Sequence, residues 1–494
     1  MRHPLPSMSD PAADRPTVSL YDTLTREKHA VEPVDRELLL YTCGPTVYNR
    51  VHIGNLRAFL TYDLLRRALQ WAGHRVRHVM NLTDVDDKTI RDSQAAGEDL
   101  KSFTQRWIDL FLADMQALAI LPPHALPRAT DAIDAMVRLT ETLLAKGAAY
   151  RGEDGSIYFK IGAFPEYGRL SHLEARSLQA GAGGRVAADE YDKDSVQDFA
   201  LWKAWTPEDG PVFWETPLGK GRPGWHLECS ALAMEHLGQS IDIHAGGIDL
   251  VFPHHENEIA QSEAATGQPF VRLWVHNEHL LVGGKKMSKS LKNFFTLEDL
   301  QRQAAATPRE VRYALLLLAH YRSHLNFQVT YEGERIVRWD SLETARGALR
   351  RLDELRRGFE QPAAGPASPE LSARLATARE AFRAAVADDL NVVRAVAALF
   401  ELQNDLNRLG AQGWDERLAA QGRALLAEAD TVLGVLAPDL EPGLGPEEQA
   451  LFERWVAARQ AKDWATADGL RGELATRGIA VKAQKDGTAS WYRS

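Results

Sequence analysis

The apolar positions near the start of the chain predict a strand, a helix and a second strand in succession. Leu38 to Thr42 is a short apolar run that ends at a Cys-Gly-Pro turn, which is typical of a buried strand. Leucines then recur at helical spacing between Leu56 and Leu69, and Gly73 is expected to end that helix. Val76 to Leu82 is the next strand-like run. This succession indicates a βαβ unit and hence a parallel sheet.

Later segments show three further patterns. Residues 151–224 are less regular, and we interpret them as an insertion between two halves of the sheet. Ile241 to His244, followed by two glycines, predicts another strand and turn, and a helix should run from about His254 to Ala265. From about Gly333 to Leu436, alanine, leucine and arginine dominate with helical periodicity and without strand-like runs, which indicates a helical bundle.

Together these patterns predict an α/β fold class with four segments. We expect a disordered tail at 1–17, a Rossmann-type parallel-sheet domain at 18–332, an α-helical bundle at 333–440 and a small α+β module at 441–494. A loop at 362–369 should interrupt the bundle, because prolines bound it.

Composition narrows the class of protein only a little. The chain has 494 residues, 45% of them hydrophobic and 26% charged, as in ordinary globular proteins of several domains. A net charge of −10 argues against a nonspecific nucleic-acid coat, although a local basic face could still bind nucleic acid. No apolar run reaches the roughly 18 residues of a membrane span, and the first residues carry no targeting pattern. We therefore expect a cytoplasmic protein with no membrane partner.

Two cysteines and one helix face form a candidate metal site. Cys43 and Cys229 are the only cysteines and lie far apart in the chain, so they build no disulfide framework. His254 and Glu258 are four residues apart on a predicted helix and project from one face. Two thiolates, an imidazole and a carboxylate suit zinc. The competing interpretations are two inert buried thiols and a solvated helix face.

Two short motifs have the chemistry of phosphate binding. His52 and Asn55 lie where a strand gives way to a helix, and a helix N-terminus attracts anions. Lys286 and Lys289 lie in a short loop after a glycine pair, where they could close over a triphosphate. Taken alone, a lysine pair is more often ordinary solvated surface.

The two motifs together resemble the HIGH and KMSKS signatures of class I aminoacyl-tRNA synthetases. Other segments resemble cysteinyl-tRNA synthetases in particular, and they are 43–48, 81–88, 221–229, 252–258, 320–323 and 388–391. The resemblance implies ligation of L-cysteine to tRNA(Cys) through an adenylate, with ATP, Mg²⁺ and one Zn²⁺ per chain that selects the thiol. It further implies attack by the 2′-hydroxyl of the tRNA and a monomer. Because zinc binds a thiolate well and a hydroxyl poorly, we expect no separate editing domain.

The resemblance also assigns roles to individual residues. Those implied to hold zinc are Cys43, Cys229, His254 and Glu258. Those implied to line the amino-acid site are Thr83, Trp225 and Asp249. Those implied to bind ATP are Gly44, His52, Gly54, Asn55, Lys286 and Lys289, of which the histidine, the asparagine and the two lysines are the catalytic set.

The chain departs from the family pattern at a few positions. Asn55 stands where the class I motif has its final histidine, but its amide can still donate a hydrogen bond, so we expect activity to survive. Lys292, the pair Asn277-Glu278 and Tyr492 also differ from the expected residues. The departures at 277–278 and 292 could alter closure of the lysine loop.

Contacts with tRNA are expected in the last two segments. Arginines cluster in the bundle at Arg346, Arg350, Arg351, Arg356 and Arg357, but a helix laced with ion pairs explains them equally well. The basic residues near the chain end are Arg471, Arg477, Lys482, Lys485 and Arg493. Trp491 resembles the family's C-terminal tryptophan and could stack on an anticodon base, or it could be a core residue of a small module.

Two other functions compete with tRNA ligation. A ligase that joins cysteine to an amino sugar would share the zinc and ATP residues but would need no tRNA-reading end. A catalytically dead paralogue that only binds RNA would have lost a zinc ligand or a motif lysine, and none is lost here.

Overall fold

The computed structural model describes most of the chain. The described residues are 16–32, 34–173, 197–287, 293–333, 335–360, 369–409, 415–436, 446–483 and 489–493, with the backbone of 185–186. The chain forms two compact units, Met1–Leu436 and Ala437–Ser494. No helix within the described ranges is long and apolar enough to cross a membrane. The predicted tail at 1–17 lies almost wholly outside the described residues.

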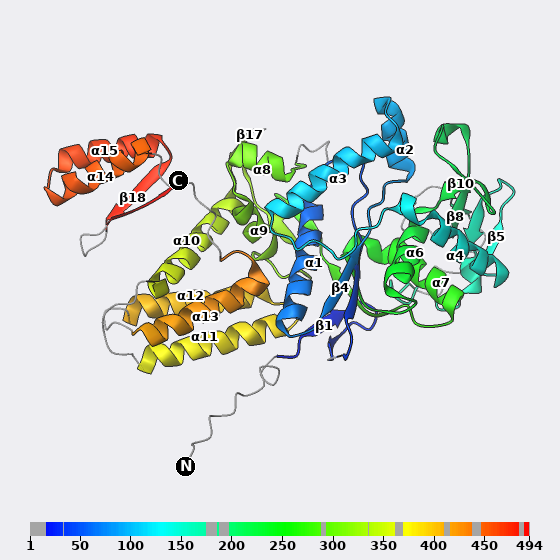
Figure 1. The fold of residues 1–494 in the computed structure, drawn as a ribbon, viewed down its shortest axis with the longest axis horizontal. Helices are drawn as coiled ribbons and strands as arrows, with labels where there is room; N and C mark the ends of the chain where they lie inside the picture. The colour runs from blue at the N-terminus through cyan, green and yellow to red at the C-terminus, as the bar shows by residue number, and fades with distance from the viewer. Residues whose placement is uncertain are drawn as a thin grey trace, which may run out of the picture. The chain divides into compact units, whose positions relative to one another are not determined.

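A four-stranded parallel sheet lies at the centre of the first unit (Figure 1). Its strand order is β12 (Val271–Asn277), β11 (Ile241–Gly247), β3 (Leu38–Thr42) and β4 (Val76–Met80), and every neighbouring pair is parallel. The predicted strand–helix–strand unit is confirmed, because helix α1 (Ile53–Trp71) connects β3 to β4. Parallel strands bring their carboxyl ends to one edge, which is where open α/β sheets bind ligands.

Helix α1 follows the sequence pattern closely. Leu56, Leu60, Leu64 and Leu69 are all buried in the core of the first unit. The helix ends at its C-cap Ala72, and Gly73 follows in the left-handed region with φ of 98°, as predicted.

The sheet is surrounded by further helices and short strands. The helices are α2 (Asp87–Ala96), α3 (Leu100–Ala117), α4 (Ile133–Ala145), α6 (Trp225–Leu237), α7 (Glu256–Thr266), α8 (Leu297–Ala304) and α9 (Pro308–Leu316). The strands are β1 (Ser19–Asp22), β2 (Glu27–Ala30), β13 (Leu280–Val282), β14 (Lys285–Lys286) and β15 (Leu325–Phe327). Helices α6 and α7 pack against each other beside the sheet.

The insertion is more regular than its sequence suggested. It contains a sheet of order β5-β6-β8-β10-β9, with β7 paired to β8. The strands are β5 (Ala149–Arg151), β6 (Ile157–Phe159), β7 (Arg185–Val186), β8 (Asp198–Ala204), β9 (Trp214–Thr216) and β10 (Gly219–Pro223). Most of these strands span two to five residues, which is too short for an alternating pattern to show.

The bundle consists of α10 (Asp340–Glu360), α11 (Pro369–Ala387), α12 (Val392–Leu409) and α13 (Glu416–Leu433). The expectation of helix directly after Gly333 is wrong, because β17 (Arg335–Arg338) pairs with β16 (Thr330–Glu332) there. Gly333 has φ of 63° and makes the turn between them, so the helical segment starts at Asp340. The predicted loop at 362–369 lies outside the described residues except for Pro369.

The second unit is small and has its own core. It contains α14 (Pro446–Gln460), α15 (Trp464–Thr476) and an antiparallel pair, β18 (Ile479–Ala483) and β19 (Ala489–Arg493). The buried core residues are Leu451, Trp455, Ala467, Leu470, Leu474 and Ile479. The α+β content agrees with the sequence prediction. The side chains of Trp491 and Tyr492, and residue Lys485, lie outside the described part of the chain.

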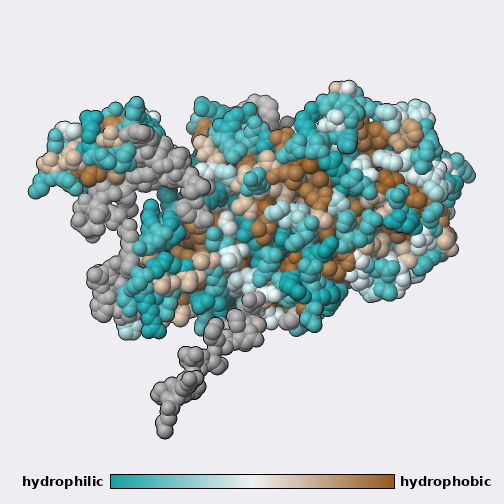
Figure 2. Space-filling model, in the orientation of Figure 1, coloured by the Kyte–Doolittle hydropathy of each residue, from teal (hydrophilic) through white to brown (hydrophobic). Residues whose placement is uncertain are grey.

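The described surface is mainly hydrophilic around its rim (Figure 2). The exposed large hydrophobic side chains in the described ranges are Leu112, Phe213, Tyr331, Val337, Val393 and Trp464. Leu112 lies on α3, Val393 on α12 and Trp464 on α15, whereas Tyr331 and Val337 lie on the paired strands β16 and β17.

Candidate metal centre and active site

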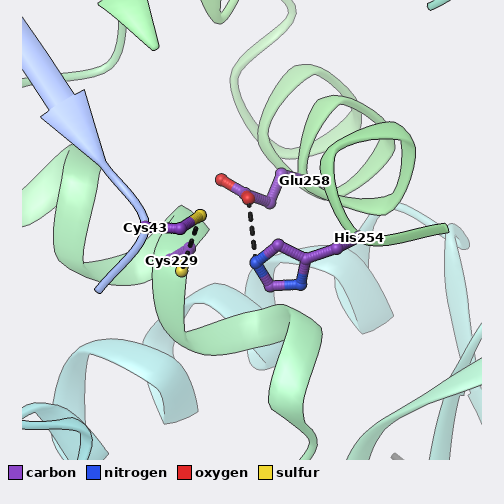
Figure 3. A group of neighbouring side chains, drawn as sticks. All are labelled: Cys43, Cys229, His254 and Glu258. Carbon is purple, nitrogen blue, oxygen red and sulfur yellow. Dashed lines mark hydrogen bonds and ion pairs between the residues drawn. The ribbon is translucent and has the colours of Figure 1, made fainter. Parts of the chain in front are cut away.

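The structure brings the four predicted metal ligands together (Figure 3). Their ligand atoms all lie within 4.8 Å of one another. The two Sγ atoms of Cys43 and Cys229 are 4.0 Å apart, and Nε2 of His254 is 3.1 Å from Oε1 of Glu258. The alternative of a solvated helix face is wrong, because His254 and Glu258 are 1% and 0% exposed.

Each ligand is positioned by the end of a regular element. Cys43 directly follows strand β3 at the carboxyl edge of the sheet, and Cys229 lies in the first turns of α6. His254 lies in the turn Val251–His255, which leads into α7, and Glu258 lies in the first turn of α7. Because His254 and Glu258 are four residues apart, they face the same side, as predicted.

Gly44 allows the chain after Cys43 to approach the neighbouring strand. A Cβ built on Gly44 would lie 1.7 Å from the carbonyl oxygen of Asn81, a distance that no relaxed side chain can adopt. Gly44→Ala is therefore expected to displace Cys43, lowering bound metal by more than half and stability by about 1–3 kcal/mol.

Metal content and the urea unfolding midpoint would measure both effects of Gly44→Ala. Gly162→Ala is the matched control, since no atom lies within 4 Å of a Cβ built there. Equal metal content and equal unfolding midpoints of the two variants would contradict the proposed role of Gly44.

Burial favours the neutral forms of the two thiols and of the imidazole in this cluster. Burial raises the pKa of the Cys43 thiol to about 11 and that of Cys229 well above its usual range. Burial also lowers the pKa of His254 to about 4, so its ring is neutral near pH 7. Oε1 of Glu258 is buried and accepts no hydrogen bond from the described residues, although His254 lies beside it. Two soft thiols, an imidazole and an unsatisfied carboxylate oxygen therefore form a donor set that fits zinc.

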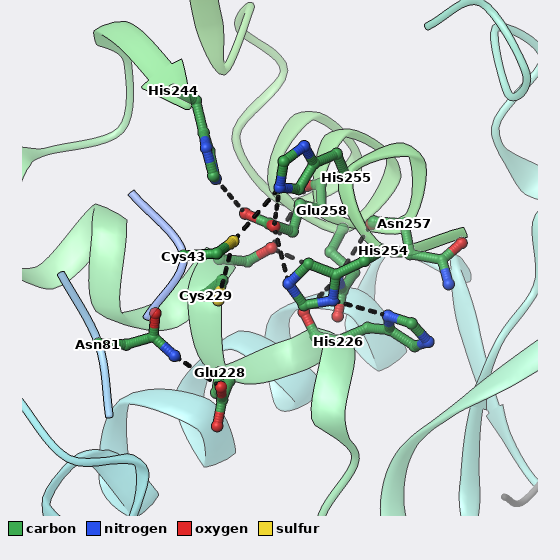
Figure 4. Close-up of polar contacts among 12 residues, drawn as sticks. Cys43, Asn81, His226, Glu228, Cys229, His244, His254, His255, Asn257 and Glu258 are labelled. Carbon is green, nitrogen blue, oxygen red and sulfur yellow. Dashed lines mark hydrogen bonds and ion pairs between the residues drawn. The ribbon is translucent and has the colours of Figure 1, made fainter. Parts of the chain in front are cut away.

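A second layer of histidines surrounds these four residues (Figure 4). His244 Nε2 lies 3.0 Å from Oε2 of Glu258, and His255 Nε2 lies 3.3 Å from Sγ of Cys43. In turn, His226 Nδ1 is 3.0 Å from Nδ1 of His254. This layer was not predicted from the sequence, and it also supplies a second possible ligand group, Cys43, His244, His255 and Glu258. His226 and His255 adjoin predicted site residues, which was a usable signal.

The residues expected at the amino-acid site lie beside the cluster. The Trp225 ring stacks on the His254 ring at 4.4 Å between centroids. Thr83 follows strand β4 and forms a hydrogen bond to Glu228, the residue before Cys229. Asp249 lies in the turn after β11, and its charge influences the pKa of both His52 and His254.

His52 caps the first turn of α1. Its Nδ1 accepts hydrogen bonds from the backbone N–H groups of Gly54 (3.1 Å) and Asn55 (3.2 Å). Burial lowers the pKa of His52 to about 4, so the ring is neutral and its single proton must lie on Nε2. The Oδ1 of Asn55 accepts a hydrogen bond from the N–H of His52 at 3.3 Å. The Nδ2 of Asn55 therefore stays available as a donor.

The two signature motifs meet in the structure. A Cβ built on Gly54 would lie 2.7 Å from the methyl carbon of Met287, so the residue after Lys286 packs against this glycine. The Nδ2 of Asn293 donates to the carbonyl of Lys286 at 3.2 Å and closes the base of the loop. Lys286 is exposed on β14, whereas Lys289 and Lys292 lie outside the described residues.

The departure at Asn277-Glu278 is accommodated locally. The Glu278 carboxylate accepts from the N–H of His279 and pairs with His324 at 3.3 Å. Arg57 of α1 donates to the carbonyls of Glu278 and His279. The segment at Glu278 and His279 is therefore hydrogen-bonded to α1, the helix that His52 caps.

Three bundle arginines already have protein partners. Arg346 pairs with Glu310, Arg356 pairs with Glu360, and Arg351 bonds to Gln403. These contacts agree with the ion-paired interpretation of the helix, and a role in binding tRNA stays a prediction.

Solved structures define the class of this fold. The chain resembles Mycobacterium tuberculosis methionyl-tRNA synthetase in complex with methionyl-adenylate, with a TM-score of 0.58 and 16% identity over 85% of this chain and 94% of that one. It also resembles the LeuRS chain of an Agrobacterium radiobacter LeuRS–tRNA–LeuAMS complex, with a TM-score of 0.58 and 13% identity over 82% and 85% of the two chains. The fold is that of the class I aminoacyl-tRNA synthetases.

Sequence families and relatives narrow the class further. The family "tRNA synthetases class I (C) catalytic domain" matches residues 30–332, the DALR domain matches 381–437, and the "Cysteinyl-tRNA ligase anticodon binding domain" matches 441–491. Cysteine–tRNA ligase of Chlamydia trachomatis is 47% identical over 482 residues, covering 95% of this chain and 98% of the relative. That of Protochlamydia amoebophila is 45% identical over 489 residues, covering 97% and 99%. The chain belongs to the cysteine–tRNA ligase family.

Proposed function

We propose that the chain joins L-cysteine to tRNA(Cys) with ATP, through a cysteinyl-adenylate, as a zinc-dependent ligase. One observation carries this proposal: the Cys43, Cys229, His254 and Glu258 cluster lies at the same sheet edge as the helix that His52 caps. A thiol-selecting centre and an anion-binding helix end thus face the region where substrates bind in such sheets.

The competing functions have less support. The match of residues 441–491 to an anticodon-binding family supports tRNA over an amino sugar as acceptor. The four candidate zinc ligands and both motif lysines are retained in the sequence, which supports an active enzyme over a dead paralogue.

In this proposal, Cys43, Cys229, His254 and Glu258 hold Zn²⁺. When bound, the ion supplies a soft Lewis acid that takes a thiol as thiolate and takes the hydroxyl of serine poorly. His244 and His255 hold the Glu258 carboxylate and the Cys43 thiol in orientation, as residues around metal ligands commonly do. Trp225 restricts the movement of His254 by stacking on it.

The residues of the two signature motifs act on the phosphates of ATP. A carboxylate oxygen of cysteine attacks the α-phosphorus of ATP, and pyrophosphate leaves. His52 donates through Nε2–H and Asn55 through Nδ2 to oxygens on this phosphorus, where negative charge builds. Lys286 and Lys289 neutralise the departing pyrophosphate, and Mg²⁺ accompanies ATP. Gly44 and Gly54 also bind ATP in this proposal, through their backbones.

The adenylate then transfers cysteine to the tRNA. The terminal 2′-hydroxyl attacks the carbonyl carbon and releases AMP. We further propose a cytoplasmic monomer whose bundle and C-terminal module contact the tRNA.

Charging of unfractionated tRNA with labelled cysteine, in the presence of ATP and magnesium, tests the activity. We expect cysteine to be charged, and labelled serine to be charged at least about 10⁴-fold less efficiently, because the site is built around the thiol. Cysteine-dependent pyrophosphate exchange without tRNA charging would favour the amino-sugar acceptor. Absence of both reactions in metal-replete protein would favour the dead paralogue.

A further inference from the structure

We propose that Glu228 is a positioning residue that makes the Thr83 hydroxyl an obligate hydrogen-bond acceptor for the α-ammonium group of cysteine. The inference rests on the proposed place of Thr83 in the amino-acid site. The two side chains come from different elements, since Thr83 follows strand β4 and Glu228 lies in the first turn of α6. Both are buried, with 1% and 2% of their surface exposed.

A backbone group fixes the polarity of the network that contains them. The N–H of Gly44, which can only donate, gives a 2.8 Å hydrogen bond to Oδ1 of Asn81. The Asn81 amide is therefore held with Nδ2 on its other side, where Figure 4 shows it directed at Glu228. Nδ2 donates to Oε1 of Glu228 at 2.8 Å and to Oγ1 of Thr83 at 3.1 Å, and these two oxygens share one of its protons because they are in direct contact with each other.

This arrangement fixes the direction of the Thr83 hydroxyl proton. Its oxygen already accepts from Asn81, so its proton goes to the remaining acceptor, Oε1 of Glu228, with which it is in direct contact. Oγ1 then has one lone pair left and no proton to offer. Any ligand group that binds this oxygen must be a donor. Of the three polar groups of cysteine, the carboxylate only accepts and the thiol is taken by the metal, so the ammonium is the donor.

The same network spans the chain segments that carry the two thiols. Gly44 follows Cys43, and Glu228 precedes Cys229. The backbone of Thr83 is also fixed, because its N–H donates to the carbonyl of Pro45 at 3.1 Å and its carbonyl accepts from Val47 at 3.0 Å. The site for the ammonium group therefore lies at a fixed distance from the two thiols. One rigid unit then binds both the ammonium and the thiol of cysteine.

Two substitutions of Glu228 separate its acceptor role from its charge. Glu228→Met keeps the length of the side chain and removes the acceptor. Glu228→Gln removes the charge and keeps an oxygen that the Asn81 amide holds toward Thr83. The probes are L-cysteine and 3-mercaptopropionate, which has the same thiol and carboxylate and lacks the amine.

The measurements are the KM of L-cysteine in pyrophosphate exchange, the Ki of 3-mercaptopropionate, and bound zinc in the intact protein. Glu228→Met is expected to raise the KM of cysteine by about 10- to 100-fold, the effect of losing one hydrogen bond to a charged group. The Ki of 3-mercaptopropionate and the zinc content should change by less than about threefold. Glu228→Gln should restore most of the selectivity for the amine.

Three results would overturn the inference. If Glu228→Met weakens both probes alike or loses zinc, Glu228 only supports the metal site. If Glu228→Gln raises the KM of cysteine by about 10-fold or more over the wild type, charge acts in place of orientation. This comparison decides even if the methionine variant does not fold. If Thr83→Val leaves the KM of cysteine unchanged while Thr83→Ser does too, Thr83 lies outside the amino-acid site, and the residue assignment in the proposed function fails with it.

Discussion

Replacing Cys229 by serine is expected to remove the bound metal and to lower kcat/KM for cysteine-dependent pyrophosphate exchange by about 10³-fold or more. A hydroxyl is a poor ligand for a soft metal, and loss of the ion leaves a site that can discriminate among small side chains by only about 1–3 kcal/mol. The hydroxyl would also be buried, since Cys229 is 1% exposed. Zinc per chain and exchange kinetics on metal-replete protein are the measurements.

The zinc content of the Cys229→Ser variant also distinguishes between the two possible ligand groups. The proposed group contains Cys229 and His254, whereas the other contains His244 and His255, and both contain Cys43 and Glu258. If the metal used the second group, the serine variant would retain zinc and His244→Ala would lose it. Ser230→Ala is the matched control, because Ser230 is the next residue of α6 and is equally buried. It should keep full zinc and activity.

The cluster of four candidate metal ligands could be predicted because the sequence offers few choices. With only two cysteines in the chain, a soft metal site has one possible thiol pair, Cys43 and Cys229. The spacing of His254 and Glu258 is a local helical property, and it survives the irregular turn Val251–His255 that precedes α7. Local periodicity also defined α1, because its leucines face one core.

The surrounding residues could not be predicted, because they depend on the register between strands. His244 lies on β11 beside Glu258, and His276 lies on the neighbouring parallel strand β12 with its Nε2 2.7 Å from Nδ1 of His255. Asn81 and Glu228 are more than 140 residues apart, and only the folded chain shows that they share a hydrogen bond. The insertion sheet was missed for a similar reason, since its short strands are stabilised by partners distant in sequence, as β6 is by β8.

The second large effect is expected at His52, where a single ring serves two purposes. Nδ1 caps helix α1 by accepting from Gly54 and Asn55, and the opposite nitrogen carries the proton. Because burial lowers the pKa of His52 to about 4, the ring donates as neutral imidazole at pH 7. Removing one such donor from a developing negative charge typically costs about 10²–10³ in kcat. Loss of a helix cap costs about 1 kcal/mol of stability.

Two variants separate the cap from the donor at this position. His52→Asn keeps a good N-cap, because the asparagine oxygen can accept from the first turn, but it is too short to replace Nε2–H. It should lower kcat for pyrophosphate exchange by about 10²–10³ and leave the unfolding midpoint close to that of the wild type. His52→Ala should show the same loss of rate and an additional destabilisation of about 1 kcal/mol.

Exchange kinetics at saturating ATP and urea unfolding of the two variants give both quantities. A fast His52→Asn enzyme would show that the Nε2 proton plays no part in stabilising the phosphorus centre. Equal stability of the two variants would show that the cap hydrogen bonds contribute little. Slow exchange by both variants with a stability gap between them would instead assign the two ring nitrogens to the two functions derived from the structure.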